Sequence, residues 1–200
     1  MIAHLRGILL EKHPNQAVVE AAGVGYDVSI PISTFTSLPD PGAEVRLRIH
    51  HVVREDAIQL FGFMSVEEKL LFEKLISVSG IGPKLGVTVL SGIAAPDLVR
   101  VIRAGDVQML TRVPGIGKKT AERIVLELRD KLDGLGGAPA ADVKGVAAVV
   151  LSQDEQDVVS ALVNLGCQRP AAEAAVKKAM GQVDGPGFEP LFRRAMELVR

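Results

Sequence analysis

Hydrophobic and polar positions alternate with a period of two through the first 63 residues. Between residues 45 and 50, three aliphatic side chains alternate with two arginines and a histidine, which is the pattern of a half-buried β-strand. Shorter β-rich runs, separated by turn-forming glycine and proline residues, lie at 2–10, 16–22, 25–30 and 57–63. Five or six short strands in this length predict a small antiparallel barrel, and the oligonucleotide-binding (OB) barrel is the leading candidate.

At residue 65 the hydrophobic period becomes helical. The segment Ser65–Glu68 has the residue types of a capping box, in which the serine accepts a bond from a first-turn amide and the glutamate reaches back to the cap. Further helix starts are indicated at Pro83, Pro96, Asp106 and Lys118. The pattern therefore predicts five short helices between residues 65 and 133.

The last third of the chain divides into a linker and a small helical domain. Residues 134–151 are mostly glycine, alanine and valine, so we expect a mobile linker with little bulk to pack. A second capping box at Ser152–Glu155 begins a segment with three helical patterns. The predicted fold is a multidomain α+β chain: residues 1–64 form the OB-like barrel, 65–133 an all-helical domain, 134–151 the linker and 152–200 a three-helix domain.

An internal repeat with a period of 35 residues lies in the predicted helical domain. The sequence Val-Ser-Gly-Ile-Gly-Pro-Lys-Leu-Gly at 78–86 recurs as Val-Pro-Gly-Ile-Gly-Lys-Lys-Thr-Ala at 113–121. Each copy leaves one helix, passes through a tight Gly-Ile-Gly hairpin and begins the next helix. This arrangement resembles the helix-hairpin-helix motif of DNA-binding proteins. The candidate phosphate-contacting residues are Gly80, Gly82 and Lys84 in the first copy, and Gly115, Gly117, Lys118 and Lys119 in the second.

Glycine and lysine in this pattern point to phosphate binding. Glycine adopts backbone conformations that cost other residues about 1–2 kcal/mol, and without a side chain it lets backbone amides approach a phosphate. The following helix presents its free N–H groups and positive dipole end to the same anion. Such contacts hold the DNA backbone and read no bases, so we expect sequence-independent binding. Two ordinary helix corners with turn glycines are the alternative, and the matching lysines in both copies weigh against it.

The composition of the chain restricts its possible partners and compartment but does not indicate a function. The net charge of −1 is unevenly distributed along the chain. It is −2 for residues 1–63 (5 basic, 7 acidic), +2 for 64–135 (11 basic, 9 acidic) and −1 for 136–200 (7 basic, 8 acidic). An excess of two positive charges in the middle segment does not by itself establish a nucleic-acid partner. The single cysteine suits a reducing compartment, and no apolar run approaches the roughly 18 residues of a membrane span. We therefore expect a cytoplasmic protein with no membrane partner.

The sequence predicts no catalytic, metal or cofactor site. Residues 112–120 superficially resemble a nucleotide-binding loop, but Arg112 and Lys119 occupy positions at which that loop requires a glycine and a hydroxyl residue. The adjacent strand residues His50 and His51 should point to opposite faces, which argues against joint metal binding. We expect no cofactor and no catalytic step in this chain.

Over nearly all of its length the chain resembles the RuvA family of Holliday-junction-recognition subunits. The resemblance is most specific at Ala22–Tyr26, Arg54–Asp56, Leu60–Phe63 and Gly115–Ile124. It implies a homotetramer formed through the barrel, with two tetramers able to sandwich a four-way junction as an octamer. It also implies that Glu55 and Asp56 form an acidic pin at the tetramer centre, and that Arg123 belongs to the DNA-binding residues.

The same resemblance implies partners. Four-way junction DNA is the ligand, and the C-terminal domain docks on a RuvB-like hexameric ATPase that drives branch migration in recombination and repair. Leu162 and Leu165 are the candidate docking residues, and a junction resolvase is a further candidate partner. For Glu55 and Asp56, a solvated hairpin tip and a metal-dependent nuclease site are the alternatives. A DNA repair enzyme subunit and a general DNA adaptor are the alternative functions of the chain.

Overall fold

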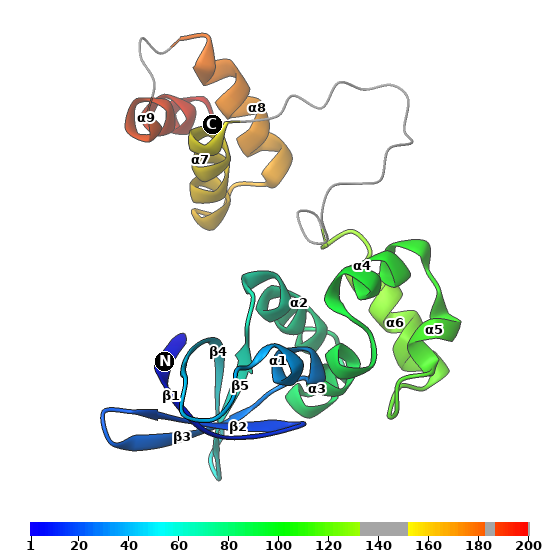
Figure 1. Ribbon diagram of the computed structural model, residues 1–200. Helices are drawn as coiled ribbons and strands as arrows, with labels where there is room; N and C mark the ends of the chain where they lie inside the picture. The colour runs from blue at the N-terminus through cyan, green and yellow to red at the C-terminus, as the bar shows by residue number, and fades with distance from the viewer. Residues whose placement is uncertain (133–151, 183–186, 200) are drawn as a thin grey trace. The chain divides into compact units, whose positions relative to one another are not determined.

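The computed structural model describes residues 1–132, 152–182 and 187–199. The chain divides into two compact units, Met1–Ala140 and Ala141–Arg200. In its described part, the first unit contains a five-stranded barrel and six helices, and the second contains three helices (Figure 1). The predicted multidomain α+β fold is confirmed, while the predicted linker at 134–151 lies outside the described residues.

Five strands close the barrel in the order β1-β2-β3-β5-β4. Neighbouring strands are antiparallel except β3 and β5, which pair in parallel through Val28 with Leu60. A closed five-stranded barrel with this crossover belongs to the predicted OB-like class. The strands are β1 (His4–His13), β2 (Gln16–Ala21), β3 (Val24–Ser29), β4 (Glu44–Val53) and β5 (Ile58–Phe63).

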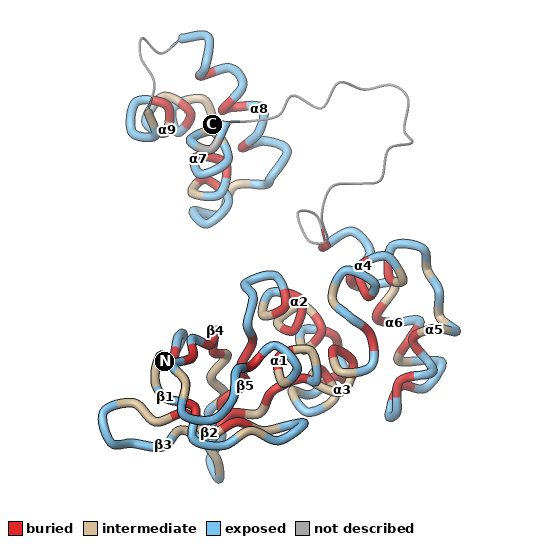
Figure 2. Tube along the Cα trace, viewed as in Figure 1, coloured by how far each residue is buried: buried red, intermediate tan, exposed pale blue. Residues whose placement is uncertain are grey.

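The alternating segment at 45–50 lies in β4 and behaves as predicted. Val45, Leu47 and Ile49 are buried in the barrel core, whereas Arg46 and Arg48 are exposed. Buried positions are interspersed with exposed ones along the strands of the barrel (Figure 2). The period-two pattern therefore identified which face of this strand packs inward.

The sequence pattern did not predict the short helix α1 (Ile32–Ser37) between β3 and β4. Its Thr34 hydroxyl donates to one carboxylate oxygen of Glu68 (3.0 Å), and the Ser33 hydroxyl donates to the other. Glu68 is only 7% exposed, and a buried carboxylate requires such donors. The capping box predicted at Ser65–Glu68 is therefore only half correct. Ser65 accepts from the Glu68 amide (3.0 Å), but the glutamate side chain bonds to α1 instead of the cap.

Five helices follow the barrel, as predicted, and they share a core with it. Phe61 and Phe63 of β5 belong to the apolar cluster of the helices. The ring of Phe72 lies 5.4 Å from that of Phe61 and 4.9 Å from that of Phe63, between centroids. The core is thus continuous across the domain border predicted near residue 64. The helices are α2 (Val66–Ile76), α3 (Pro83–Gly92), α4 (Ala95–Ala104), α5 (Val107–Thr111) and α6 (Lys118–Leu128).

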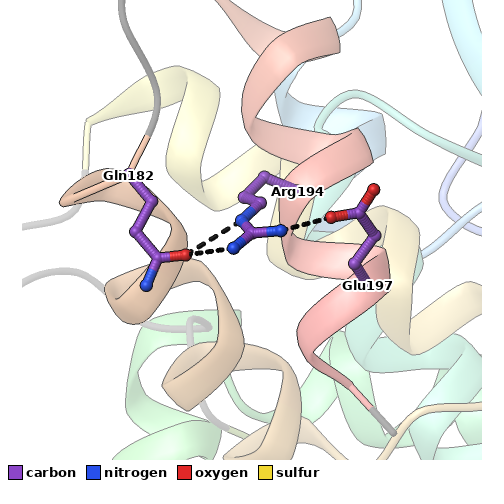
Figure 3. Close-up of polar contacts among 3 residues, drawn as sticks. All are labelled: Gln182, Arg194 and Glu197. Atoms are coloured by element: carbon purple, nitrogen blue, oxygen red, sulfur yellow. Dashed lines mark hydrogen bonds and ion pairs between the residues drawn. The ribbon is translucent and has the colours of Figure 1, made fainter.

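The described part of the second unit consists of the three predicted helices, α7 (Gln153–Asn164), α8 (Arg169–Met180) and α9 (Phe188–Leu198). The capping box of α7 at Ser152 is complete, because both of its reciprocal hydrogen bonds are present. Arg194 of α9 donates twice to the side-chain oxygen of Gln182, at 2.9 and 2.6 Å, and once to Glu197 (Figure 3). Since Gln182 follows α8, this arginine ties the end of α8 to α9.

In the described part of the chain, no single helix is long and apolar enough to cross a membrane. The neighbouring helices α3 and α4 reach the necessary length and composition only as a pair, and that pair is bent by 97°.

Candidate nucleic-acid interface

The two copies of the repeat adopt the same backbone structure. Hairpin 1 (residues 77–82) connects α2 to α3, and hairpin 2 (residues 112–117) connects α5 to α6. In each hairpin the isoleucine amide donates to the carbonyl of the valine three residues earlier, at 3.0 Å in hairpin 1 and 3.1 Å in hairpin 2. The caps of the second helices, Gly82 and Gly117, have φ, ψ angles of −86°, 168° and −85°, 168°. The sequence repeat is therefore a structural repeat.

The two glycines of each hairpin have different roles. Gly80 and Gly115 have φ angles of +91° and +87°, a region that costs residues with a side chain about 1–2 kcal/mol. Gly82 and Gly117 have an extended backbone, and a Cβ atom placed on either would meet nothing within 4 Å. The first glycine thus serves the turn, and the second leaves open space in front of the helix N-terminus. The sequence predicted both effects but not their division between the two positions.

The helices that follow the hairpins have no side-chain cap among the described residues, and neither first turn contains an acidic residue. Helices α2 and α5, by contrast, are capped by the side chains of Ser65 and Asp106, and α4 has Asp97 in its first turn. The first-turn amides of a helix have no intrahelical partner. Those of α3 and α6, together with the positive ends of the helix dipoles, therefore face an open site for an anion.

Positive charge accompanies these helix N-termini. Lys84, Lys118 and Lys119 are exposed. No acidic residue occurs in residues 74–96 or in residues 107–121, so each hairpin lies in a stretch of chain free of carboxylates. An overall net charge of −1 is thus compatible with a locally positive surface that attracts phosphates.

Buried side chains hold both hairpins on the helical core. Ile81 and Ile116 are only 4% and 5% exposed, so each isoleucine anchors its hairpin in the core. Small residues occur where the second helix of each motif packs most closely. Ala121 is fully buried, and a Cβ atom on Gly86 would lie 3.1 Å from the ring of Phe72. The hairpins are therefore rigidly supported, which preserves the positions of their amides.

A contact between the two motifs breaks the symmetry of the repeat. The guanidinium of Arg123 in α6 donates to the carbonyl of Ser79 in hairpin 1 (2.9 Å), and its Nε lies 3.9 Å from the Glu127 carboxylate. The counterpart of Arg123 in the first copy, Thr88, instead donates to the Lys84 carbonyl of its own helix (3.0 Å). The arginine predicted to contact DNA thus also joins hairpin 1 to the second motif, which the sequence did not indicate.

The predicted pin residues lie at the tip of the hairpin between β4 and β5. Glu55 and Asp56 are exposed, and the Arg54 amide donates to the Ala57 carbonyl across the turn (2.8 Å). The pairing of β1 with β4 ends at Arg48, followed by one bond from the Ile49 amide to the Ala3 carbonyl (2.9 Å), and β3 pairs with β5 only at Leu60 and Phe61. The last residues before the tip therefore have only each other as strand partners. The acidic tip (residues 54–57) is carried on a two-stranded ribbon that projects from the barrel (Figure 1).

Ionisable side chains on the barrel have protein partners. Nδ1 of His50 lies 3.1 Å from a carboxylate oxygen of α2, whereas Nδ1 of His51 accepts from the amide of Ile2 (3.1 Å). The two rings therefore have different partners. Arg6 donates to Glu44 (2.7 Å), and this hydrogen bond holds the pKa of the carboxyl below its ordinary value. Within the residues that the structure describes, no three His, Cys, Asp or Glu side chains are grouped to hold a metal ion.

Of the two leucines predicted to dock a motor protein, only one is accessible. Leu162 is 1% exposed, and its prediction as a surface contact is wrong, because it is buried in the apolar cluster that α7 forms with α8 and α9. Leu165 caps the end of the helix and is 64% exposed. The sequence did not single out α9, where Phe192 and Met196 line a groove of about 740 Å³.

The chain combines a closed OB-like barrel with two helix-hairpin-helix motifs, and the second helix of each motif has an open N-terminus beside a lysine. These features define a class of protein that binds the DNA backbone. Residues 1–62 match the family model of the RuvA N terminal domain, and residues 72–130 match that of the SAM-like helix-hairpin-helix tandem.

Relatives that span the whole chain identify the family. The Holliday junction branch migration complex subunit RuvA of Solibacter usitatus is 63% identical over 204 residues, and that of Acidobacterium capsulatum is 56% identical over 203 residues. In both comparisons the whole of each chain is covered. The protein of the same name from Cronobacter sakazakii is 44% identical, with 98% of each chain covered. The chain therefore belongs to the RuvA family of branch migration complex subunits.

Proposed function

We propose that the chain is the junction-binding subunit of a branch-migration complex, which holds four-way DNA open while a separate ATPase moves it. The observation that carries this proposal is the pair of matching hairpins. Each presents an open helix N-terminus beside a lysine, and the Arg123–Ser79 hydrogen bond joins the two motifs. Full-length similarity to proteins named Holliday junction branch migration complex subunit RuvA supports it.

The hairpins bind phosphates and not bases. Gly82 and Gly117 leave room for a phosphate oxygen at the amides of α3 and α6, while Lys84 and Lys119 neutralise its charge. Two such sites, joined by the Arg123–Ser79 hydrogen bond, suit two phosphates of a single duplex arm. Since amides and lysines read no base edges, this contact suits a protein that must hold the DNA while the sequence at the crossover changes.

Glu55 and Asp56 form an acidic pin that repels DNA, whereas the hairpins attract it. Carboxylates at the tip of a projecting ribbon repel the phosphates that converge at the centre of a junction. A continuous duplex would bring its backbone past the tip, whereas an open four-way junction has a gap between its strands at that point. The acidic tip therefore raises selectivity for junctions and lowers the affinity for DNA in general.

The assembly is a homotetramer formed through the barrel, in which four chains place eight hairpins around one junction. Two tetramers enclose the DNA as an octamer. The family resemblance supports this assembly, and the presence of both hairpins in each chain fits four equivalent duplex arms. The chain performs no catalytic step and needs no cofactor, because branch migration draws its energy from a RuvB-like hexameric ATPase. A junction resolvase is a further partner, and the complex acts in the cytoplasm.

The second unit contains the surface that binds the ATPase. This small helical domain has several exposed apolar side chains, among them Leu165 (64%), Met196 (49%) and Phe188 (40%). Phe188 stacks on Phe192 with ring centroids 5.4 Å apart, which gives α9 an ordered apolar surface. Such a surface fits a partner helix or hydrophobic patch.

A gel-shift comparison of a four-way junction, a fork and a linear duplex at matched salt tests the proposal. We expect the junction to bind most tightly, and equal affinity for all three would instead indicate a general DNA adaptor. A DNA repair enzyme would cut or join strands in the absence of the ATPase, which gel analysis of end-labelled junctions detects. ATP-driven branch migration should require both this chain and the ATPase.

A further inference from the structure

Helix α1 links the barrel to both helices of the first motif. At the end of α1, Leu38 is buried in the apolar cluster of the barrel. Near its start, the Thr34 hydroxyl donates to the Glu68 carboxylate of α2 (3.0 Å), and the Ile32 amide donates to the Ser91 hydroxyl of α3 (3.1 Å). Figure 1 shows α1 beside α3. The first motif is therefore attached to the barrel by directional contacts as well as by the shared apolar core.

The contacts with α1 are made at the ends of α2 and α3 that are remote from hairpin 1. Residue 68 lies nine positions before the hairpin, which begins at residue 77, and residue 91 lies nine positions after its end at residue 82. Each contact is therefore about 13 Å from the hairpin along its helix, and a tilt of about 5° moves the hairpin by about 1 Å. A binding site requires its groups to lie within about 0.5 Å of the productive geometry. Small changes at α1 are thus large enough to misplace hairpin 1.

The buried carboxylate of Glu68 is the strongest orienting contact between α1 and the helices. The hydroxyls of Ser33 and Thr34 donate to its two oxygens, and Thr34 is fully buried. Hydrogen bonds restrict both distance and angle, and those to a charged group are stronger than those between neutral groups. Apolar contacts, in comparison, are non-directional. Another polar contact of the barrel with α2, between His50 and Glu73, is partly exposed, and solvent weakens such contacts. Glu68 therefore sets the orientation of α2 on the barrel.

We propose that Glu68 is a positioning residue for junction recognition, which fixes both hairpins relative to the barrel through α1. This inference rests on the proposed junction-binding function and its tetramer. The Arg123–Ser79 hydrogen bond keeps the two hairpins together, so a tilt at α1 preserves the site for one duplex arm. The tilt changes instead the spacing between hairpins of different chains, because the chains assemble through their barrels. A four-way junction must engage several chains at once, so the loss of Glu68 weakens junction binding and not duplex binding.

The test compares the affinities of full-length variants for a four-way junction and for a linear duplex as long as one arm. Glu68→Leu removes the acceptor of both hydroxyls. It should lower junction affinity about tenfold or more, because simultaneous binding at several sites depends on their geometry. Its duplex affinity should stay within about threefold of wild type, because the phosphate contacts of each chain are preserved. Lys84→Ala, which removes a phosphate contact itself, should weaken the binding of both ligands.

Two matched variants separate positioning from folding. Glu68→Gln should bind both ligands like wild type, because its amide accepts from one hydroxyl and donates to the other. Ser65→Ala removes the hydrogen bond that the same turn of α2 makes with its own cap (3.0 Å). It should lower the melting temperature but leave both affinities unchanged, because the link to the barrel is intact.

Wild-type junction affinity of Glu68→Leu would overturn the positioning role. Equal losses for junction and duplex would overturn it too and would assign Glu68 to the folding of the helices, as would dissociation of the variant into smaller species on size-exclusion chromatography to the assembly. Thr34→Val has nearly the same shape as wild type and removes one donor from the side of α1, so it tests the link even if Glu68→Leu does not fold. It should weaken junction binding alone, and an unchanged junction affinity would refute the inference. If wild type itself fails to prefer junctions, the proposed function fails, and the inference with it.

Discussion

Alanine substitutions at the two glycines of hairpin 2 should separate folding from DNA binding. At Gly115 the φ angle is +87°, and a new Cβ atom would lie 3.1 Å from a methyl group of Leu85. The left-handed conformation costs alanine about 1–2 kcal/mol, and the Leu85 side chain must also shift. We expect Gly115→Ala to lower the free energy of unfolding of the first unit by about this amount, which corresponds to a melting temperature lower by about 3–10 °C.

Gly117→Ala should leave folding nearly unchanged and weaken DNA binding. Its φ of −85° suits alanine, and the new Cβ atom meets nothing within 4 Å. The lower entropy of the unfolded chain adds about 0.4–1 kcal/mol of stability, and the poor capping by alanine removes a similar amount. In the complex, however, the Cβ atom occupies the space in front of the α6 amides. Loss of one hydrogen bond to a charged group, about 1.5–3 kcal/mol, predicts about 10- to 150-fold weaker junction binding.

Calorimetry of the full-length variants and gel shifts at one salt concentration measure the two effects. Gly80→Ala and Gly82→Ala form the matched pair in hairpin 1, where the φ angles are +91° and −86°, and should reproduce the same separation. Normal junction binding by Gly117→Ala would refute the role of the α6 amides. An unchanged melting temperature for Gly115→Ala would refute the cost assigned to its backbone conformation.

Three further predictions concern charge and docking. Lys119→Ala should weaken binding equally for all sequences and lower the slope of log K against log salt by about 0.9; titrations that show an unchanged slope would place this lysine outside the phosphate site. Neutral replacement of Glu55 and Asp56 by Gln and Asn should strengthen duplex binding and reduce junction selectivity in competition gel shifts, whereas weaker binding would contradict a repulsive tip. Leu165→Ser should reduce ATPase-driven migration without affecting junction binding, while the buried Leu162→Ala should destabilise the second unit by about 2–5 kcal/mol. Full migration activity of Leu165→Ser would remove that residue from the contact.

The elements of this protein could be predicted from its sequence because their signals are local. The alternation at residues 45–50 identified both a strand and its buried face, since that pattern depends only on neighbouring positions. The hairpins were predicted for the same reason. A turn glycine, an anchoring isoleucine and a lysine lie within a few residues, and the repetition after 35 residues makes a chance match improbable. The capping box at Ser152 formed as predicted because both of its partners are in one turn of helix.

Only the tertiary structure decided the contacts between distant parts of the chain. Glu68 has the sequence position of a capping residue, but its burial beside α1 provides two hydroxyl donors, and these outweigh the local bond. Arg123 bonds to Ser79 at a separation of 44 residues, which no local pattern encodes. Leu162 and Leu165 are the same residue type, yet the neighbouring helices bury one and leave the other in water. Burial and long-range hydrogen bonds depend on how whole elements pack, so they follow from the assembled core and not from the spacing of residues along the chain.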